Sequence, residues 1–387
     1  MENKIELQPI TDIQQQKEVL SQQEWDLWQL VLPQAGTVVL KGPPGGGKTA
    51  IWTSIAKKLR FQFFDFALTH LDSADLGGLP VLNKNNDGIS VSTYAVNDWA
   101  IESNKRPTII FLDEINRPSD DIINALLKVL DKRLGLNYVL NDNVYIVAAG
   151  NLGMSEDGTT VSALDSAMNN RIIHQTFNPT LSDWIEYYAQ YNVHPVVVSF
   201  LQTDEGHEHY RKRIHDADAY TTPRSWTHLS DFLLFHKYTD LKVIKEEVSK
   251  HAIKYIGNHS ATAFVTYLVS LTSTPIPSMS EIVSKGKSLK RELQELNLAQ
   301  KAYIVNSYTI SILQNVKAKQ IKTFIELLPE DLIALMYSRI ITAAITISTD
   351  SVVDPTKTSY TVNQVINPYL NVLNVNRTIS EKLLQSY

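Results

Sequence analysis

The sequence predicts an α/β fold in which a parallel sheet flanked by helices is followed by an all-α region. Between residues 36 and 178, short apolar runs alternate with amphipathic stretches, the pattern of a sheet covered on both faces. A glycine-rich loop separates the first apolar run from the first amphipathic stretch. Beyond Pro179 the alternation stops, and helical periodicity dominates to about Ser348.

The composition is that of a globular protein. The chain has 387 residues, of which 43% are hydrophobic and 20% charged, a length that suggests two or three domains. A net charge of −5 gives no overall attraction to nucleic acids or to anionic membranes. The absence of cysteine excludes disulfides, thiolate metal sites and cysteine nucleophiles. No signal peptide or membrane-length apolar stretch is visible, so we expect a cytoplasmic protein.

Residues 1–35 predict a helical lead-in. Ser21 and Glu24 have the spacing of a capping box at the start of a helix over Ser21–Leu32. Pro33 then ends this helix.

The α/β core is expected to span residues 36–178. Its predicted strands are Thr37–Lys41, Thr108–Leu112 and Val144–Ala148, and its predicted helices include Thr49–Leu59 and Asp120–Leu134. A helical lid over 179–260 and a C-terminal helical region over 261–387 follow, because no further strand pattern is seen there.

The glycine-rich loop matches the pattern G-x-x-x-x-G-K-[ST] between a predicted strand and a predicted helix. Glycines let backbone N–H groups turn toward phosphate oxygens, and the helix N-terminus favours an anion. Lys48 would reach the β- and γ-phosphates of ATP, and the Thr49 hydroxyl would hold Mg²⁺. The residues expected to bind the nucleotide are Gly42, Pro43, Pro44, Gly45, Gly46, Gly47, Lys48, Thr49 and Ala50.

Two adjacent acids end the second predicted strand. Asp113 would support Mg²⁺, and Glu114 would polarise the attacking water. Acids also follow strands as helix caps, but a P-loop 65 residues upstream favours the spacing of a Walker B motif.

Asn151 stands at the tip of the third predicted strand. A polar side chain at this point can reach the water near the γ-phosphate. Asparagine is equally suited to form a turn there, and the residue alone does not decide between the two.

Taken together, six motifs in order resemble the MoxR-type AAA+ ATPases over roughly residues 36–260. They are the P-loop, Asp75-Leu76-Gly77-Gly78-Leu79-Pro80, the run from Phe111 to Arg117, Ala148-Ala149-Gly150-Asn151, Asn170-Arg171, and Thr222-Pro223-Arg224-Ser225-Trp226. The last motif places the sequence nearest to the branch of that family with Thr-Pro-Arg-Ser-Trp in its lid.

The resemblance implies a P-loop AAA+ core and assigns roles to three further residues. Asn151 corresponds to sensor 1, Arg171 to the arginine finger that reaches a neighbouring subunit's ATP, and Arg224 to sensor 2 in the lid. A planar guanidinium suits charge developing at the γ-phosphate. The alternative for each arginine is an ordinary surface salt bridge.

Two segments resemble the family's insertions. Residues 79–93 correspond to the helix-2 insert, and residues 135–143 to the hairpin before sensor 1. In the family such loops face the ring pore or a partner. Plain surface loops are the alternative.

The resemblance implies a Mg²⁺-dependent ATPase that forms a ring, expected to be a hexamer. Its work would be to remodel or activate a protein client, with a von Willebrand A-domain protein as one partner. The alternatives are an ATP-driven nucleic-acid motor or restriction-type subunit, and an assembly switch with little turnover. Nothing in the sequence indicates a nucleic-acid module or a membrane partner.

The histidines at 207, 209 and 215 are expected to be exposed loop residues, because they lack the spacing of a metal motif.

Overall fold

The chain divides into two compact units, Met1–Pro179 and Thr180–Tyr387. The computed structural model describes residues 8–84, 88–134, 138–153, 164–185, 193–211, 221–278, 281, 285–315 and 336. Of the C-terminal helical region expected over 261–387, the part after Asn315 lies outside these residues except for position 336.

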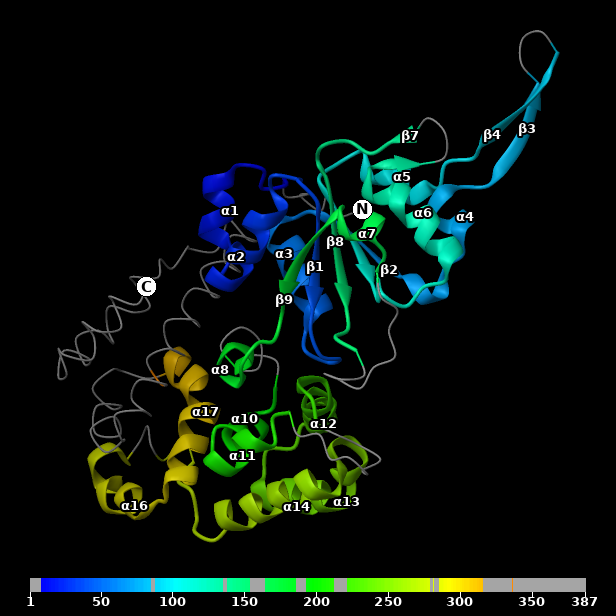
Figure 1. Ribbon diagram of the computed structural model, residues 1–387. Coiled ribbons are helices and arrows are strands. Elements are labelled where there is room, and N and C mark those ends of the chain that lie inside the picture. The colour runs from blue at the N-terminus through cyan, green and yellow to red at the C-terminus, as the bar shows by residue number, and fades with distance from the viewer. Residues whose placement is uncertain are drawn as a thin grey trace, which may run out of the picture. The chain divides into compact units, whose positions relative to one another are not determined.

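The first unit is built on a parallel sheet, which confirms the predicted α/β class. Its strand order is β2-β5-β8-β1-β9, and each neighbouring pair is parallel (Figure 1). Strand β8 lies between β1 and β5, so the carboxyl ends of these three strands meet at one edge of the sheet. The strands are β1 (Thr37–Lys41), β2 (Gln62–Ala67), β5 (Thr108–Asp113), β8 (Val144–Gly150) and β9 (Ile172–Thr176).

Both faces of the sheet are covered, which explains the continuous apolar strands. In β1, Val38 and Leu40 belong to one apolar cluster, whereas Val39 between them belongs to another. The first cluster includes Trp28 and Trp52, both fully buried. Helices α1 (Ile13–Val19), α2 (Gln22–Val31) and α3 (Lys48–Leu59) lie on that side, and α4 (Ser73–Gly77), α5 (Asp98–Ser103) and α6 (Asp120–Leu130) contribute to the other.

The predicted capping box at the start of α2 is confirmed. Glu24 Oε2 accepts from the Ser21 N–H at 2.8 Å, and Ser21 Oγ accepts from the Glu24 N–H at 3.3 Å. Glu24 is buried and also contacts Ser54 and Lys58 of α3, each at 2.6 Å. The same carboxylate therefore caps α2 and joins it to the helix that follows the glycine-rich loop.

The helix predicted over Asp120–Leu134 is too long. Helix α6 ends at Leu130, and Lys132 has a left-handed φ of 56°, which breaks the helix. Arg133–Leu134 instead forms strand β6, paired antiparallel with β7 (Tyr138–Val139). The apolar spacing of α6 continues through Leu134 because this side chain also points into the core.

A second hairpin occupies the predicted insertion at 79–93. Strands β3 (Pro80–Lys84) and β4 (Ser90–Tyr94) pair antiparallel and project from the first unit between α4 and α5 (Figure 1). Gly78 at its base has a φ of 81°, and a Cβ there would lie 2.0 Å from the Ala95 carbonyl oxygen. Only glycine fits this close approach.

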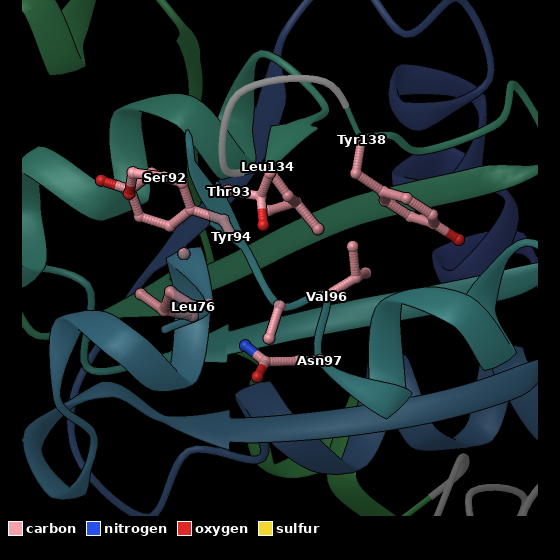
Figure 2. Close-up of a pocket in the computed structure, with 11 residues that line it drawn as sticks. Leu76, Ser92, Thr93, Tyr94, Val96, Asn97, Leu134 and Tyr138 are labelled. Atoms are coloured by element: carbon pink, nitrogen blue, oxygen red, sulfur yellow. The ribbon is translucent and has the colours of Figure 1, made fainter. Parts of the chain in front are cut away.

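A pocket of about 280 Å³ lies at the base of this hairpin. Figure 2 shows its lining, which includes Leu76, Tyr94, Val96, Leu134 and Tyr138. Asn97 also lines it, and its amide donates to the Ala74 and Asp75 carbonyls of α4. No catalytic or nucleotide-binding residue predicted from the sequence is among these lining residues.

The described part of the second unit contains helices without strands, as the periodicity predicts. Phe200, Trp226 and Phe264 are fully buried at its centre. The boundary expected at 260–261 lies inside helix α14, which has a kink at Gly257. The helices are α8 (Leu181–Trp184), α10 (Pro195–Leu201), α11 (Asp204–Glu208), α12 (Pro223–Phe235), α13 (Leu241–His251), α14 (Ile253–Leu271), α16 (Lys290–Glu295) and α17 (Leu298–Asn315).

The expectation of exposed histidines was wrong for His209. Its side chain is 3% exposed, and its Nδ1 lies 2.8 Å from Ser260 Oγ. His207 is exposed on α11, and position 215 lies outside the described residues. Among the helices that the structure describes, none has the length and apolar character needed to cross a bilayer.

Candidate nucleotide-binding site

The glycine-rich loop connects β1 to α3, as predicted. Gly45 and Gly47 have φ angles of 69° and 91°, which suit glycine. A Cβ at Gly47 would meet no atom within 4 Å, whereas one at Gly42 would lie 2.0 Å from the Phe177 carbonyl oxygen. Gly42 is thus required by packing against the chain after β9, and Gly45 and Gly47 by the turn that leads into the N-terminus of α3.

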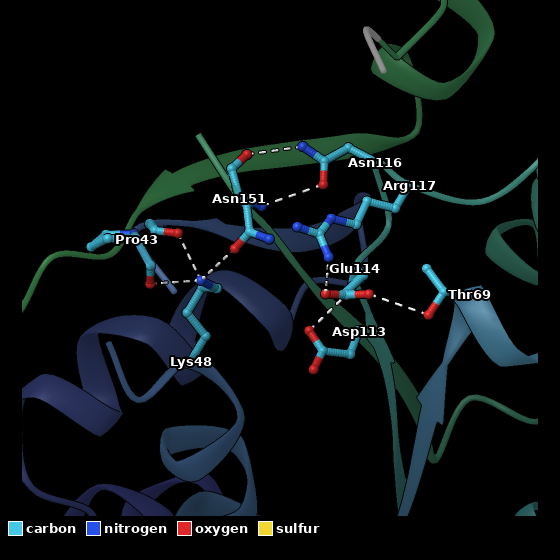
Figure 3. A network of polar contacts seen from close by, with 9 residues as sticks. Pro43, Lys48, Thr69, Asp113, Glu114, Asn116, Arg117 and Asn151 are labelled. Carbon is cyan, nitrogen blue, oxygen red and sulfur yellow. Dashed lines mark hydrogen bonds and ion pairs between the residues drawn. The ribbon is translucent and has the colours of Figure 1, made fainter. Parts of the chain in front are cut away.

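Lys48, the first residue of α3, is 8% exposed and joins the loop to the end of β8. Its Nζ donates to the carbonyl oxygens of Gly42 at 2.7 Å and Pro43 at 2.9 Å, and to Asn151 Oδ1 at 3.2 Å (Figure 3). The fold therefore brings Lys48 and Asn151 together from positions 103 residues apart. A cation held between the glycine-rich loop and an amide oxygen is suited to meet a phosphate group.

Asp113 and Glu114 follow at the end of β5 (Figure 3). Asp113 Oδ1 accepts from the Glu114 N–H at 2.9 Å. Glu114 has a left-handed φ of 58°, uncommon for a residue with a side chain. Its Oε1 pairs with Arg117 Nη1 at 2.7 Å, and its Oε2 accepts from Thr69 Oγ1 at 3.2 Å. These two partners hold the carboxylate in one orientation.

The sequence reasoning assigned no role to Arg117 or Thr69. The spacing of three residues between Glu114 and Arg117 is a signal that could have found the ion pair. Thr69 lies in the 3₁₀ turn Leu68–His70 after β2, a strand that the sequence pattern did not reveal. Its contact with Glu114 results from the pairing of β2 with β5, which the sequence pattern does not reveal.

A further acid, Asp65, lies on the strand next to the one that carries Asp113. Burial, and then the nearby Asp113 carboxylate, raise the pKa of Asp65 above its ordinary value. Asp65 lies on β2, directly beside β5. The carboxyl end of the sheet thus has an acidic side near Asp113 and a cationic side near Lys48.

Oxygen ligands such as the Thr49 hydroxyl and the Asp113 carboxylate suit Mg²⁺. Thr49 is the second residue of α3, and both side chains are partly exposed at the carboxyl end of the sheet. Within the described ranges, no group of three or more His, Cys, Asp or Glu side chains could hold a metal ion. The residues fit an ion that takes one or two protein ligands and completes its shell with phosphate and water, as Mg²⁺ does.

Asn151 is 7% exposed and is fixed by Asn116, a residue to which the sequence reasoning gave no role. Asn116 Nδ2 donates to the Asn151 carbonyl at 2.9 Å, and the Asn151 N–H donates to Asn116 Oδ1 at 3.3 Å (Figure 3). Asn116 belongs to the run from Phe111 to Arg117, and its place there was its only sequence signal.

Arg171 lies between helix α7 (Ser166–Asn169) and β9 and is paired within its own chain. Its Nε and Nη2 donate to Asp131 at 2.8 and 3.0 Å, and its Nη1 donates to the Ala167 carbonyl at 2.9 Å. The hydrogen bonds and charge of Asp131 raise the pKa of Arg171 above its ordinary value. The ion pair is partly exposed. The surface salt bridge considered from the sequence is therefore present.

Arg224 lies in the second unit, in the first turn of α12, with an exposed side chain. The other residues of its motif have structural roles. Thr222 and Ser225 form a capping box, Pro223 takes the first helical position, and Trp226 is fully buried and donates to the His209 carbonyl at 2.9 Å. Arg224 is the one residue of the motif that faces solvent without such a role.

Comparison with known proteins identifies part of the first unit. Residues 37–172 match the family model described as AAA domain (dynein-related subfamily). This segment, about a third of the chain, is thus an AAA domain. It contains the glycine-rich loop, the Asp113-Glu114 pair, Asn151 and Arg171. None of the curated proteins matches the sequence.

Among solved structures, two mutants of RuvB from Thermotoga maritima match the chain. One has 16% sequence identity and the other 15%, each over 79% of this chain and 88% of that protein, with a TM-score of 0.35.

Proposed function

We propose that this protein is a Mg²⁺-dependent ATPase of the MoxR type. The observation that carries the proposal is the convergence of Lys48, Asn151 and the Asp113-Glu114 pair at one edge of the sheet. The match to an AAA domain supports nucleotide binding by the same segment. These groups would bind a nucleoside triphosphate, support its metal ion and orient a water.

The chemistry follows from the order of the strands. Lys48 would contact the β- and γ-phosphates in place of the backbone carbonyls that it now contacts. Bound Mg²⁺, held by Thr49 and Asp113, would neutralise phosphate charge. Glu114 would accept a hydrogen bond from the attacking water and take its proton as the γ-phosphate is cleaved. Asn151 would orient the same water or the γ-phosphate from the neighbouring strand.

The placement of Arg171 supports a site shared between subunits. Ile172, the next residue, pairs with Thr37 at the start of β1, whereas the glycine-rich loop follows Lys41 at its end. Strands β1 and β9 are parallel, so Arg171 lies at the amino ends of the strands, whereas the glycine-rich loop lies at their carboxyl ends. The two are roughly 16 Å apart along the strand direction. An arginine at that position is poorly placed to reach a nucleotide bound by its own chain, which favours a role at the site of another subunit.

We therefore propose a ring oligomer, a hexamer by resemblance, in which Arg171 acts as an arginine finger in trans and Arg224 as a lid sensor. The ring would remodel or activate a protein client in the cytoplasm, with a von Willebrand A-domain protein as a partner. This client role rests on the resemblance of the six motifs alone.

The test is release of phosphate from ATP by the purified chain at increasing protein concentration. Turnover per subunit should rise with concentration, since the proposed site is complete only between subunits. Lys48→Ala should abolish turnover, whereas Lys57→Ala, an exposed lysine on the same helix, should leave it unchanged. Absence of turnover at every concentration would overturn the proposal.

A second assay addresses the client. A purified von Willebrand A-domain protein should stimulate phosphate release, and double-stranded DNA should not. Stimulation by DNA alone would replace the remodelling role with that of a nucleic-acid motor. Tight ATP binding without turnover would favour an assembly switch.

A further inference from the structure

Asn116 connects the loop after β5 to the end of β8 through its side chain. The β5–β8 pairing ends in register at Leu112 and Ala148. Beyond it, the Ile115 N–H donates to the Ala149 carbonyl at 2.9 Å. The Asn116 side chain then donates to and accepts from the backbone of Asn151. The side-chain amide therefore continues the row of hydrogen bonds between the two segments beyond the last backbone bond. Figure 3 shows both bonds between Asn116 and Asn151.

Two bonds to one residue fix orientation as well as position. The N–H and the carbonyl of Asn151 belong to the two peptide groups on either side of its Cα, so the two bonds restrain both groups, whereas a single bond would leave one of them free to rotate. Asn116 and Asn151 are 6% and 7% exposed, so water has little access to replace either bond. The backbone orientation of Asn151 then decides where its side chain points.

The neighbouring glycine provides the space for this contact. A Cβ at Gly150 would lie 3.1 Å from Asn116 Oδ1 and 3.3 Å from its Cγ. A side chain at position 150 would therefore press on the amide of Asn116. On its other side, the Gly150 carbonyl accepts from the Gly42 N–H at 3.3 Å. Residues 150 and 151 are thus held between the glycine-rich loop and Asn116.

From these contacts we propose that Asn116 is a positioning residue for ATP hydrolysis, acting through Asn151. It links the loop that carries Glu114 to the amide that contacts Lys48, so that the water-orienting and phosphate-binding groups keep one geometry. The inference rests on the proposed ATPase function. It predicts an effect on steps that involve the γ-phosphate and little effect on steps that involve the rest of the nucleotide.

The test compares Asn116→Ala, Asn151→Ala and the double variant. Asn116→Ala should lower kcat about 10- to 100-fold, the loss typical of a misplaced catalytic group. Its Kd for ADP should stay within about twofold of that of the unaltered protein, because ADP lacks the phosphate that Asn151 would meet. The double variant should be no slower than Asn151→Ala, since both changes remove the same contact.

Asn104→Ala is the matched control. The Asn104 side chain also holds a backbone segment, because it accepts from the Asn141 N–H at 2.7 Å and donates to the Val139 carbonyl at 2.9 Å. These contacts lie at the β6–β7 hairpin. We expect Asn104→Ala to lose about as much thermal stability as Asn116→Ala but to keep the kcat of the unaltered protein. If both variants reduced kcat equally, the effect would be one of stability, and the inference would be overturned.

Gly150→Ala provides an independent test should Asn116→Ala fail to fold. It should lower kcat with ADP binding retained, because its methyl group would displace the Asn116 amide. A wild-type kcat in either variant, or additive effects in the double variant, would overturn the inference.

If the unaltered protein bound ATP without hydrolysing it, the ATPase proposal would fail separately. Asn116→Ala should then still reduce the preference for ATP over ADP in binding, and an unchanged preference would overturn the inference.

Discussion

Asp131 holds the guanidinium of Arg171 through two hydrogen bonds, of 2.8 Å to Nε and 3.0 Å to Nη2. Asp131 follows the last residue of α6, and Arg171 immediately precedes β9. Arg171 lies away from the glycine-rich loop of its own chain, because the residue after it aligns with the start of β1. This relationship leads to the first prediction.

Arg171→Ala and Glu114→Gln subunits should each be inactive alone and regain activity when mixed. In a mixed ring, some sites combine Glu114 from one subunit with Arg171 from its neighbour. Phosphate release from separately purified and then mixed variants measures this. A mixture as inactive as its components would show that Arg171 does not act across subunits. Each variant should retain nucleotide binding, since neither change removes a P-loop contact.

Asp131→Ala should change the rate of hydrolysis less than about fivefold, because exposed ion pairs contribute little. Steady-state turnover of this variant beside Arg171→Ala checks the expectation. A loss with Asp131→Ala as large as with Arg171→Ala would show that the ion pair itself is needed for the arginine to function.

Arg117→Ala should lower kcat about tenfold while ADP binding is retained, because Glu114 would lose the partner that orients its carboxylate. Lys105→Ala is the control, since Lys105 and Glu102 form an ion pair of the same sequence spacing before β5. Kinetics of phosphate release together with ADP titration separate the two effects. Equal kcat values in the two variants would show that the ion pair between Arg117 and Glu114 does not contribute to activity, as is common for surface salt bridges.

Gly78→Ala should destabilise the base of the β3–β4 hairpin, whereas Gly77→Ala should not. At Gly78 the new Cβ would lie 2.0 Å from a carbonyl oxygen at a φ of 81°, but at Gly77 it would meet nothing within 4 Å. Alanine at Gly77 should even stabilise α4, by about 0.5–1 kcal/mol. Limited proteolysis of the hairpin and thermal unfolding compare the two variants. Similar cleavage rates would show that the hairpin tolerates a shift at its base.

The second unit should lose stability as the pH falls below about 6.5, the ordinary pKa of histidine. His194 is buried and neutral, because its Nδ1 accepts from the Val196 N–H and its Nε2 donates to the Tyr238 carbonyl. Burial lowers the pKa of His194 in the folded state. Between the lowered pKa and 6.5 the unfolded chain binds a proton that the folded chain does not, so acid favours unfolding by up to about 1.4 kcal/mol per pH unit.

His194→Asn removes this titration and retains a residue that can cap α10. Denaturant unfolding of both proteins at pH 8 and pH 5.5 measures the difference. The free energy of unfolding of the variant should depend less on pH than that of the unaltered protein. An equal dependence would mean that other groups account for it.

Much of the fold follows from local patterns. Strands β1, β5 and β8 were predicted because they are buried on both faces and therefore apolar throughout. Strands β2 and β9 were missed because each lies at an edge of the sheet, and their residues are mostly only partly buried. Helix α6 was extended too far because Leu134 of β6 continues its apolar spacing.

The candidate site divides in the same way. Residue types at a fixed local spacing are enough to predict the glycine-rich loop, the Asp113-Glu114 pair and the candidate Asn151. The partners of these residues become visible only in the folded chain. Contacts from Asn116 to Asn151, from Thr69 to Glu114 and from Asp131 to Arg171 join segments 35 to 45 residues apart. The first two exist because the sheet order places both β8 and β2 beside β5, and the third joins the end of α6 to the start of β9. Packing of the whole unit sets this arrangement, which local spacing does not encode.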